Sequence, residues 1–149
     1  MAGATPPPKN FWKKVNDYGL SKNVTFQENP DDSQLLSLYQ GALCFALSSD
    51  EEGFGMVILE AMACGIPVVS TRCGGPDGIF TDGKHGYLVD VGNAFELAER
   101  LNFLCTNLRD NREMGLRARE HVENNFSEKV TRQTFFDTWN KLLGKRIHE

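Results

Sequence analysis

The stretch from residue 52 to residue 60 is Glu52-Gly-Phe-Gly-Met-Val-Ile-Leu-Glu60, and it continues as Ala-Met-Ala-Cys64. Its apolar run predicts a helix that begins after Gly55 and is apolar on nearly every face, so we expect this helix to be buried in a core. Between Gly53 and Thr71, Glu60 is the one charged side chain. Because an unpaired charge is costly to desolvate, a carboxylate in that helix needs a partner or a ligand.

The residues before the helix indicate which ligand would suit it. Gly53 and Gly55 leave bare backbone where the helix begins, and Glu52 stands just before them. Helix N-termini carry about half a positive charge and unpaired N–H groups, so they bind phosphates. Glu60 follows about five residues into the helix, or roughly 7–8 Å along its axis at 1.5 Å per residue. This spacing suits a nucleotide whose diphosphate lies at the glycines and whose ribose lies at Glu60.

Three other interpretations of the same residues stay open. A buried Glu60 can be the structural partner of an Arg or of backbone amides. Glu52 can be a solvated surface acid beside Asp50 and Glu51, and the two glycines can merely form a turn. The agreement among these features, more than any one of them, favours a ligand site.

Composition restricts the class of protein. A chain of 149 residues suits one ordinary domain with one core. The net charge of −4 argues against nucleic acid or an anionic membrane surface as the main partner. The four cysteines show no Cys-x-x-Cys spacing and the three histidines are scattered, so we expect reduced thiols and no metal site. Residues 1–10 lack the apolar core of a signal peptide, which favours a cytoplasmic protein.

The remaining chain predicts short strands that alternate with helices. Strands are expected at 23–27, 42–47, 67–71 and 87–89, and a disordered tail at 1–9. Helices are expected at 10–18, at 34–39 with Asp32 or Ser33 as the cap, from 56 to Gly65, and at 94–104, 111–124 and 128–143. This alternation predicts an α/β fold with a Rossmann-like parallel sheet flanked by helices. Ligands bind outside the carboxyl ends of such strands, which is where the loop at 48–55 falls.

The central stretch also carries a family resemblance. Glu52 to Glu60, followed by Ala-Met-Ala-Cys-Gly-Ile-Pro-Val-Val, resembles the Glu-x7-Glu signature of retaining GT-B glycosyltransferases of the family 4 type. Gly74-Gly75-Pro76, Asp82-Gly83 and Gly86-Tyr-Leu-Val are similar to the next block of that family. The resemblance covers residues 10–143. It implies the C-terminal half of a GT-B fold, with a Rossmann-like donor domain at 10–126 and a C-terminal helix at 127–149 that crosses to an N-terminal domain.

The resemblance implies a site for a nucleotide-diphosphate sugar and a retaining transfer of hexose to a glycan, lipid or other hydroxyl acceptor. Glu52 would be catalytic, since it would orient the donor sugar and stabilise positive charge near its anomeric carbon. Glu60 would bind the ribose hydroxyls, and the backbone at 27–29 would contact the base. The sugar and diphosphate would meet the backbone of Gly53, Phe54, Gly55 and Met56. The family's sites need no cofactor and no metal.

Two departures from the family pattern limit what the chain is expected to do. Gly78 stands where the family usually has a Glu. Nothing before residue 10 matches the acceptor domain, or the loop with an Arg and a Lys that clamps the diphosphate. We therefore expect a donor domain without its partner, and donor binding about 10²- to 10⁴-fold weaker for two lost hydrogen bonds of about 1.5–3 kcal/mol each. The isolated chain is expected to be inactive.

The partner of this chain is left open at this stage. It is either a missing N-terminal acceptor domain or, if the chain is a non-catalytic nucleotide-sugar-binding module, a separate acceptor-domain subunit. The resemblance also allows peripheral membrane association of the full enzyme. The apolar face of the last helix either packs on this domain or, without its partner, supports self-association; it comprises Phe135, Phe136, Trp139, Leu142 and Leu143.

Overall fold

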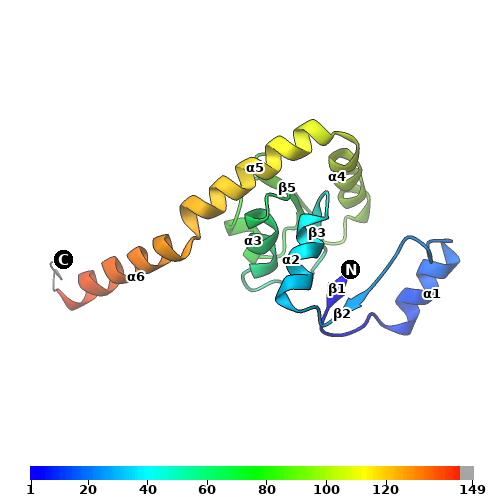
Figure 1. Cartoon of the computed structure of the whole chain (residues 1–149), viewed down its shortest axis with the longest axis horizontal. Helices are drawn as coiled ribbons and strands as arrows, with labels where there is room; N and C mark the ends of the chain where they lie inside the picture. The colour runs from blue at the N-terminus through cyan, green and yellow to red at the C-terminus, as the bar shows by residue number, and fades with distance from the viewer. Residues whose placement is uncertain (145–149) are drawn as a thin grey trace. The chain divides into compact units, whose positions relative to one another are not determined.

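The computed structural model describes residues 1–144, and the chain divides into a unit of residues 1–41 and a larger unit that begins at residue 42 (Figure 1). The smaller unit has a two-stranded parallel sheet in which β1 pairs with β2. Its elements are β1 (Ala2–Gly3), α1 (Lys9–Asp17), β2 (Gln27–Glu28) and α2 (Asp32–Gln40).

The first nine residues differ from the disordered tail predicted at 1–9. Ala2 lies opposite Gln27 in the parallel pair, and the Met1 ammonium group donates a hydrogen bond to the Thr25 carbonyl at 2.9 Å. The strand predicted at 23–27 begins only at Gln27. Pairing with a segment 24 residues away satisfies these backbone groups, and local composition carries no signal of such a contact.

The larger unit holds the predicted α/β architecture (Figure 1). Its strands β3, β4 and β5 lie in that order, all parallel. The elements are β3 (Phe45–Leu47), α3 (Met56–Ala63), β4 (Val68–Thr71), the 3-10 helix η1 (Gly75–Gly78), β5 (Gly86–Val89), α4 (Ala94–Thr106), α5 (Leu108–Asn125) and α6 (Glu128–Leu143). The parallel sheet is confirmed, although the strands of residues 1–144 form two separate sheets where four strands of one sheet were expected.

The core of the larger unit forms between the sheet and its helices. All four residues of β4 are buried, as expected for a central parallel strand. Val69 and Val89 pack with Leu104 of α4 and Met114 of α5. Helix α3 lies against α5 (Figure 1). This packing fixes the edge of the sheet at which β3 and β4 end.

Helix ends follow local sequence signals with one correction. The cap of α2 is Asp31, since its carboxylate accepts from the Gln34 amide while the Gln34 side chain accepts from the Asp31 amide. This reciprocal pair outcompetes the predicted caps Asp32 and Ser33. Helix α3 ends before Gly65 as predicted, with the Gly65 and Ile66 amides donating back into its last turn. Helix α6 has the predicted bounds.

Within residues 1–144, no helix combines the length and the apolar character required to cross a bilayer.

Candidate functional site

The loop that carries Glu52 follows β3 at the carboxyl edge of the sheet, where the sequence places it. The Glu52 amide donates to the Cys73 carbonyl at 3.1 Å, and the Glu52 carbonyl accepts from the Gly75 amide at 2.9 Å. Glu52 and Gly74 thus form an isolated parallel bridge beyond the strand ends. The hydroxyl of Thr71 donates to the Ser49 carbonyl at 2.5 Å. The loops after β3 and β4 are therefore held together as one rigid edge, and the half-buried Glu52 side chain projects from it.

Two glycines allow the backbone to take this shape. Gly55 is the N-cap of α3 with φ +91°, a conformation that favours glycine. A Cβ on Gly55 would also lie 3.2 Å from the Cδ1 atom of Ile79. Gly75 packs directly on the neighbouring loop, since a Cβ there would lie 2.7 Å from the carbonyl carbon and oxygen of Phe54. Gly55, which is predicted to meet the ligand, therefore also serves the close packing of the loop.

Glu60 lies on an exposed face of α3, which corrects the prediction that this helix is buried on nearly every side. The buried residues of α3 are Ile58, Leu59, Ala61 and Met62. Met56 is 57% exposed and lies one turn before Glu60 on the same face. An apolar composition does not reveal which face a domain covers, and here the face with Glu60 is open. An exposed carboxylate one turn from the loop is accessible to a ligand from solvent.

Phe54 and Met56 complete the exposed part of the loop. Phe54 is 50% exposed, and its ring meets the ring of Phe126 edge-on with centroids 6.4 Å apart. Gly53 has no atom within 4 Å of the position that a Cβ would occupy. The loop thus presents open backbone at Gly53 and an apolar surface beside it. All six predicted site residues lie on one continuous segment, from the edge of the sheet into the first two turns of α3.

The second loop of this edge is organised by a small charge network that sequence analysis missed. The Arg72 guanidinium lies 3.1 Å from an Asp82 oxygen and 3.7 Å from an Asp77 oxygen. The other Asp82 oxygen accepts from the Leu88 amide of β5 at 3.0 Å, and Asp77 accepts from the Gly74 amide at 3.1 Å. These groups fix η1 and the Gly74 backbone against which Glu52 is bridged. The Asp82-Gly83 turn signal was the only sequence indication of this role.

Two histidines that were scattered in sequence stack on each other. The rings of His85 and His121 lie with centroids 4.3 Å apart and planes 24° apart. Burial, then the charges of His121, Lys84 and Arg117, lower the pKa of His85 to about 4. The Thr81 amide donates to Nδ1 of His85 at 3.2 Å, which requires a neutral ring with an acceptor at that atom. Among the described residues 1–144, no three His, Cys, Asp or Glu side chains are grouped so that they could hold a metal ion.

The backbone at 27–29, which is predicted to contact the base, lies in the smaller unit. Asn29 takes a left-handed conformation with φ +44°, and its amide donates to the Gly3 carbonyl at 3.0 Å. The same unit has a hollow of about 290 Å³. It is lined by Gln27, Ser33, Gln34, Ser37 and Leu38.

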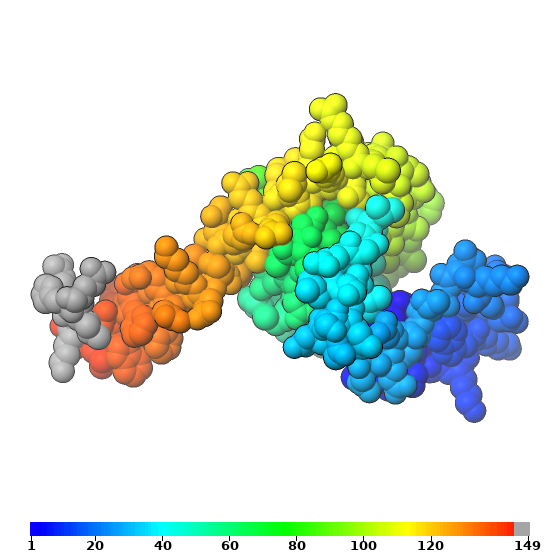
Figure 2. All heavy atoms as spheres, in the orientation of Figure 1, coloured from blue at the N-terminus to red at the C-terminus, as the bar shows by residue number. Residues whose placement is uncertain are grey.

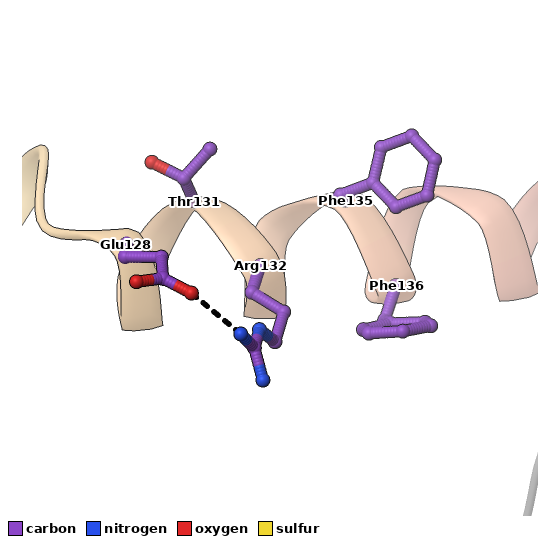
Figure 3. Close-up of a pocket in the computed structure, with 5 residues that line it drawn as sticks. All are labelled: Glu128, Thr131, Arg132, Phe135 and Phe136. Carbon is purple, nitrogen blue, oxygen red and sulfur yellow. Dashed lines mark hydrogen bonds and ion pairs between the residues drawn. The ribbon is translucent and has the colours of Figure 1, made fainter.

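Helix α6 has no buried residue, and its side chains are visible as orange to red spheres in Figure 2. An open hollow of about 550 Å³ lies along it. Figure 3 shows Glu128 pairing with Arg132 on one side of the helix, with Phe136 next in line. The five apolar side chains of the predicted face are all exposed, Trp139 at 49%. The alternative that this face packs on its own domain is therefore wrong for residues 128–143.

The fold matches that of known glycosyltransferases. Sucrose-phosphate synthase from Thermosynechococcus elongatus superposes with a TM-score of 0.85 at 27% identity, covering 96% of this chain and 38% of that one. The Anabaena protein HepE, solved in complex with UDP, gives a TM-score of 0.83 at 27% identity over 89% of this chain and 36% of that one. The fold and its similarity to these solved structures thus define an α/β domain of the GT-B glycosyltransferase class.

The sequence comparison gives the family. The family model of glycosyl transferases group 1 matches residues 1–121, so this chain belongs to the glycosyl transferases group 1. It is 44% identical over 135 residues to N-acetyl-alpha-D-glucosaminyl L-malate synthase from Bacillus anthracis, covering 89% of this chain and 35% of the relative. It is 33% identical over 123 residues to D-inositol 3-phosphate glycosyltransferase from Corynebacterium diphtheriae, covering 83% and 29%. The chain spans about a third of the length of these relatives.

Proposed function

We propose that this chain is the donor-binding part of a retaining, family 4 type hexosyltransferase that uses a nucleotide-diphosphate sugar. The observation that carries the proposal is the arrangement of Glu52 and Glu60. One carboxylate stands at the carboxyl edge of the sheet, and the other stands on the open face of α3 just beyond a glycine-flanked helix start. The Anabaena protein HepE, which is 26% identical over 89% of this chain, has been solved in complex with UDP-glucose, and this supports a donor of this class.

Each part of the edge has a role in this proposal. The first amides of α3 and the open backbone at Gly53 meet the diphosphate, because a helix N-terminus attracts anions. Glu60 accepts hydrogen bonds from the ribose diol. Glu52 orients the donor sugar and stabilises positive charge as the bond to the leaving diphosphate lengthens. The bridge to Gly74 holds Glu52 in place, so little reorganisation is needed when charge develops.

The chemistry requires a second wall opposite the donor, which the edge formed by the loops after β3 and β4 does not supply. No acceptor site is formed by the edge described above, and a transfer needs the acceptor hydroxyl positioned against the anomeric carbon. We therefore infer that the isolated polypeptide binds donor weakly and transfers little or no sugar. It would gain activity with an acceptor domain, in the same chain or on a separate subunit. The transfer would reach a glycan, lipid or other hydroxyl group.

The alternative is a non-catalytic module that binds a nucleotide sugar. Both candidates bind donor through Glu60, but only the transferase uses Glu52. The test is to join the chain to an acceptor domain of a group 1 relative and to measure sugar transfer and the anomeric configuration of the product by NMR. The transferase proposal expects a retained configuration and a loss of at least about 100-fold in turnover for Glu52→Gln. Equal turnover in Glu52→Gln would favour the module, and an inverted product would exclude the retaining mechanism.

A further inference from the structure

His121 on α5 is linked to the loop at residues 53–55 by two independent sets of contacts. Its Nε2 atom lies 2.7 Å from the Ile79 carbonyl oxygen. Ile79 is 2% exposed, and its Cδ1 atom would lie 3.2 Å from a Cβ on Gly55. The Ile79 side chain is therefore packed directly against the N-cap of α3. Holding the Ile79 carbonyl holds the side chain on which Gly55 rests.

The second route runs through aromatic rings. The His121 ring meets the Phe126 ring with centroids 5.8 Å apart, and Phe126 in turn meets Phe54 at 6.4 Å. Phe54 lies between Gly53 and Gly55 in the loop. Edge-on aromatic pairs of this kind add stability beyond that of the apolar area they bury. Phe126 is half-buried beyond the end of α5, so the chain of rings links α5 to the exposed loop.

The hydrogen bonds of His121 fix its ring in one tautomer. A carbonyl oxygen only accepts, so Nε2 must carry the proton that bonds Ile79. Nδ1 is then free to accept, and the Asn125 side-chain amide lies 3.2 Å from it. Asn125 also donates to the His121 carbonyl at 2.8 Å. The ring also stacks on His85. The imidazole therefore has a partner at each ring nitrogen, and it contacts two further rings.

We propose that His121 is a positioning residue for the nucleotide-sugar loop, acting on Gly55 through Ile79 and on Phe54 through Phe126. The effect of His121 on donor binding rests on the proposed function. The contacts that hold the loop are present in the ligand-free chain and do not depend on it. His121 is not one of the predicted ligand contacts; it holds Phe54 and Gly55, the two residues just before the start of α3. Removal of its ring frees the loop while leaving Glu52 and Glu60 in the chain.

The test begins with hydrogen exchange of the ligand-free 149-residue chain, measured by mass spectrometry on peptides that cover residues 53–58. The expected result for His121→Ala is exchange about 10-fold faster in this segment, whereas β4 keeps its protection. His121→Gln, which can still donate to Ile79 but lacks the ring, should give an intermediate rate. Glu120→Ala, the adjacent exposed position on α5, is the matched control and should match the wild type.

Binding of UDP-, GDP- and ADP-sugars by the same variants completes the test. The proposal expects the affinity for whichever donor binds to fall about 10-fold in His121→Ala and to be unchanged in Glu120→Ala. Loop exchange equal in His121→Ala and Glu120→Ala would overturn it, as would an exchange increase spread evenly over the whole chain in both His121 variants. If the wild type binds no donor, the proposed function fails, and loop exchange still decides the role of His121.

Discussion

Gly75→Ala is the substitution with the most sharply defined structural consequence. The added Cβ would lie 2.7 Å from the Phe54 carbonyl carbon and oxygen and 2.8 Å from its Cα. Ordinary contacts of this kind begin near 3.4 Å, so backbone has to move by about 0.7 Å, and no flexible side chain can absorb the shift. Overpacking of this size costs about 1–3 kcal/mol. The movement also displaces the Glu52 carbonyl, which accepts from the Gly75 amide at 2.9 Å.

Gly78→Ala is the matched control, because Gly78 lies at the other end of the same 3-10 helix with nothing within 4 Å of a new Cβ. Thermal unfolding should show Gly75→Ala lower in Tm by roughly 4–8 °C for a loss of about 2 kcal/mol. Gly78→Ala should stay within about 0.5 kcal/mol of the wild type. Donor affinity should fall at least about 10-fold in Gly75→Ala only. Equal stability and equal affinity in the two variants would refute the claim that the two loops are locked together.

Two further predictions follow from groups outside the loop. The pKa of His85, lowered to about 4 from an ordinary 6.5, means that the unfolded chain binds the proton first as the pH falls. Stability should therefore be lost between about pH 6.5 and pH 4, by about 2 kcal/mol at pH 5 relative to pH 8, and urea titrations of His85→Gln should show a flatter profile. A slope that is unchanged in this variant would contradict the assignment. Burial, with the Cys105 thiol 4.0 Å away, raises the pKa of Cys44 to about 12, so iodoacetamide should label exposed Cys105 well before Cys44. Peptide mass spectrometry that finds equal labelling rates would show this to be wrong.

Sequence patterns predicted those parts of the fold that local chemistry decides. The α6 bounds follow from Ser127 at the N-cap position and from the apolar spacing after it. The buried strand β4 follows from a continuous apolar run that starts after Pro67. The position of the Glu52 loop follows from the rule that a loop after a parallel strand lies at the carboxyl edge. Each of these depends on residues within a few positions of one another.

The errors arose where long-range contacts decide. The exposure of Glu60 depends on which face of α3 meets α5 and the sheet, and an all-apolar helix gives no preference. The pairing of Ala2 with Gln27 joins segments far apart in sequence. The stack of His85 on His121 joins positions 36 residues apart with no shared motif, and it forms only because α5 crosses the loop before β5. The sequence therefore predicted where the candidate site residues lie in the fold but not the groups that brace them.

The most direct test of the central claim is a titration of the chain with UDP-, GDP- and ADP-sugars, followed by NMR, on the wild type and on Glu60→Ala. Glu120→Ala serves as an exposed-carboxylate control. The account predicts that one donor class perturbs the amides of the Gly53–Met56 loop in the wild type and in the control. It also predicts affinity at least about 10-fold weaker in Glu60→Ala, the effect of losing about 1.4 kcal/mol. Binding of Glu60→Ala as tight as that of the wild type, or no response to any nucleotide sugar at millimolar concentration, would contradict it.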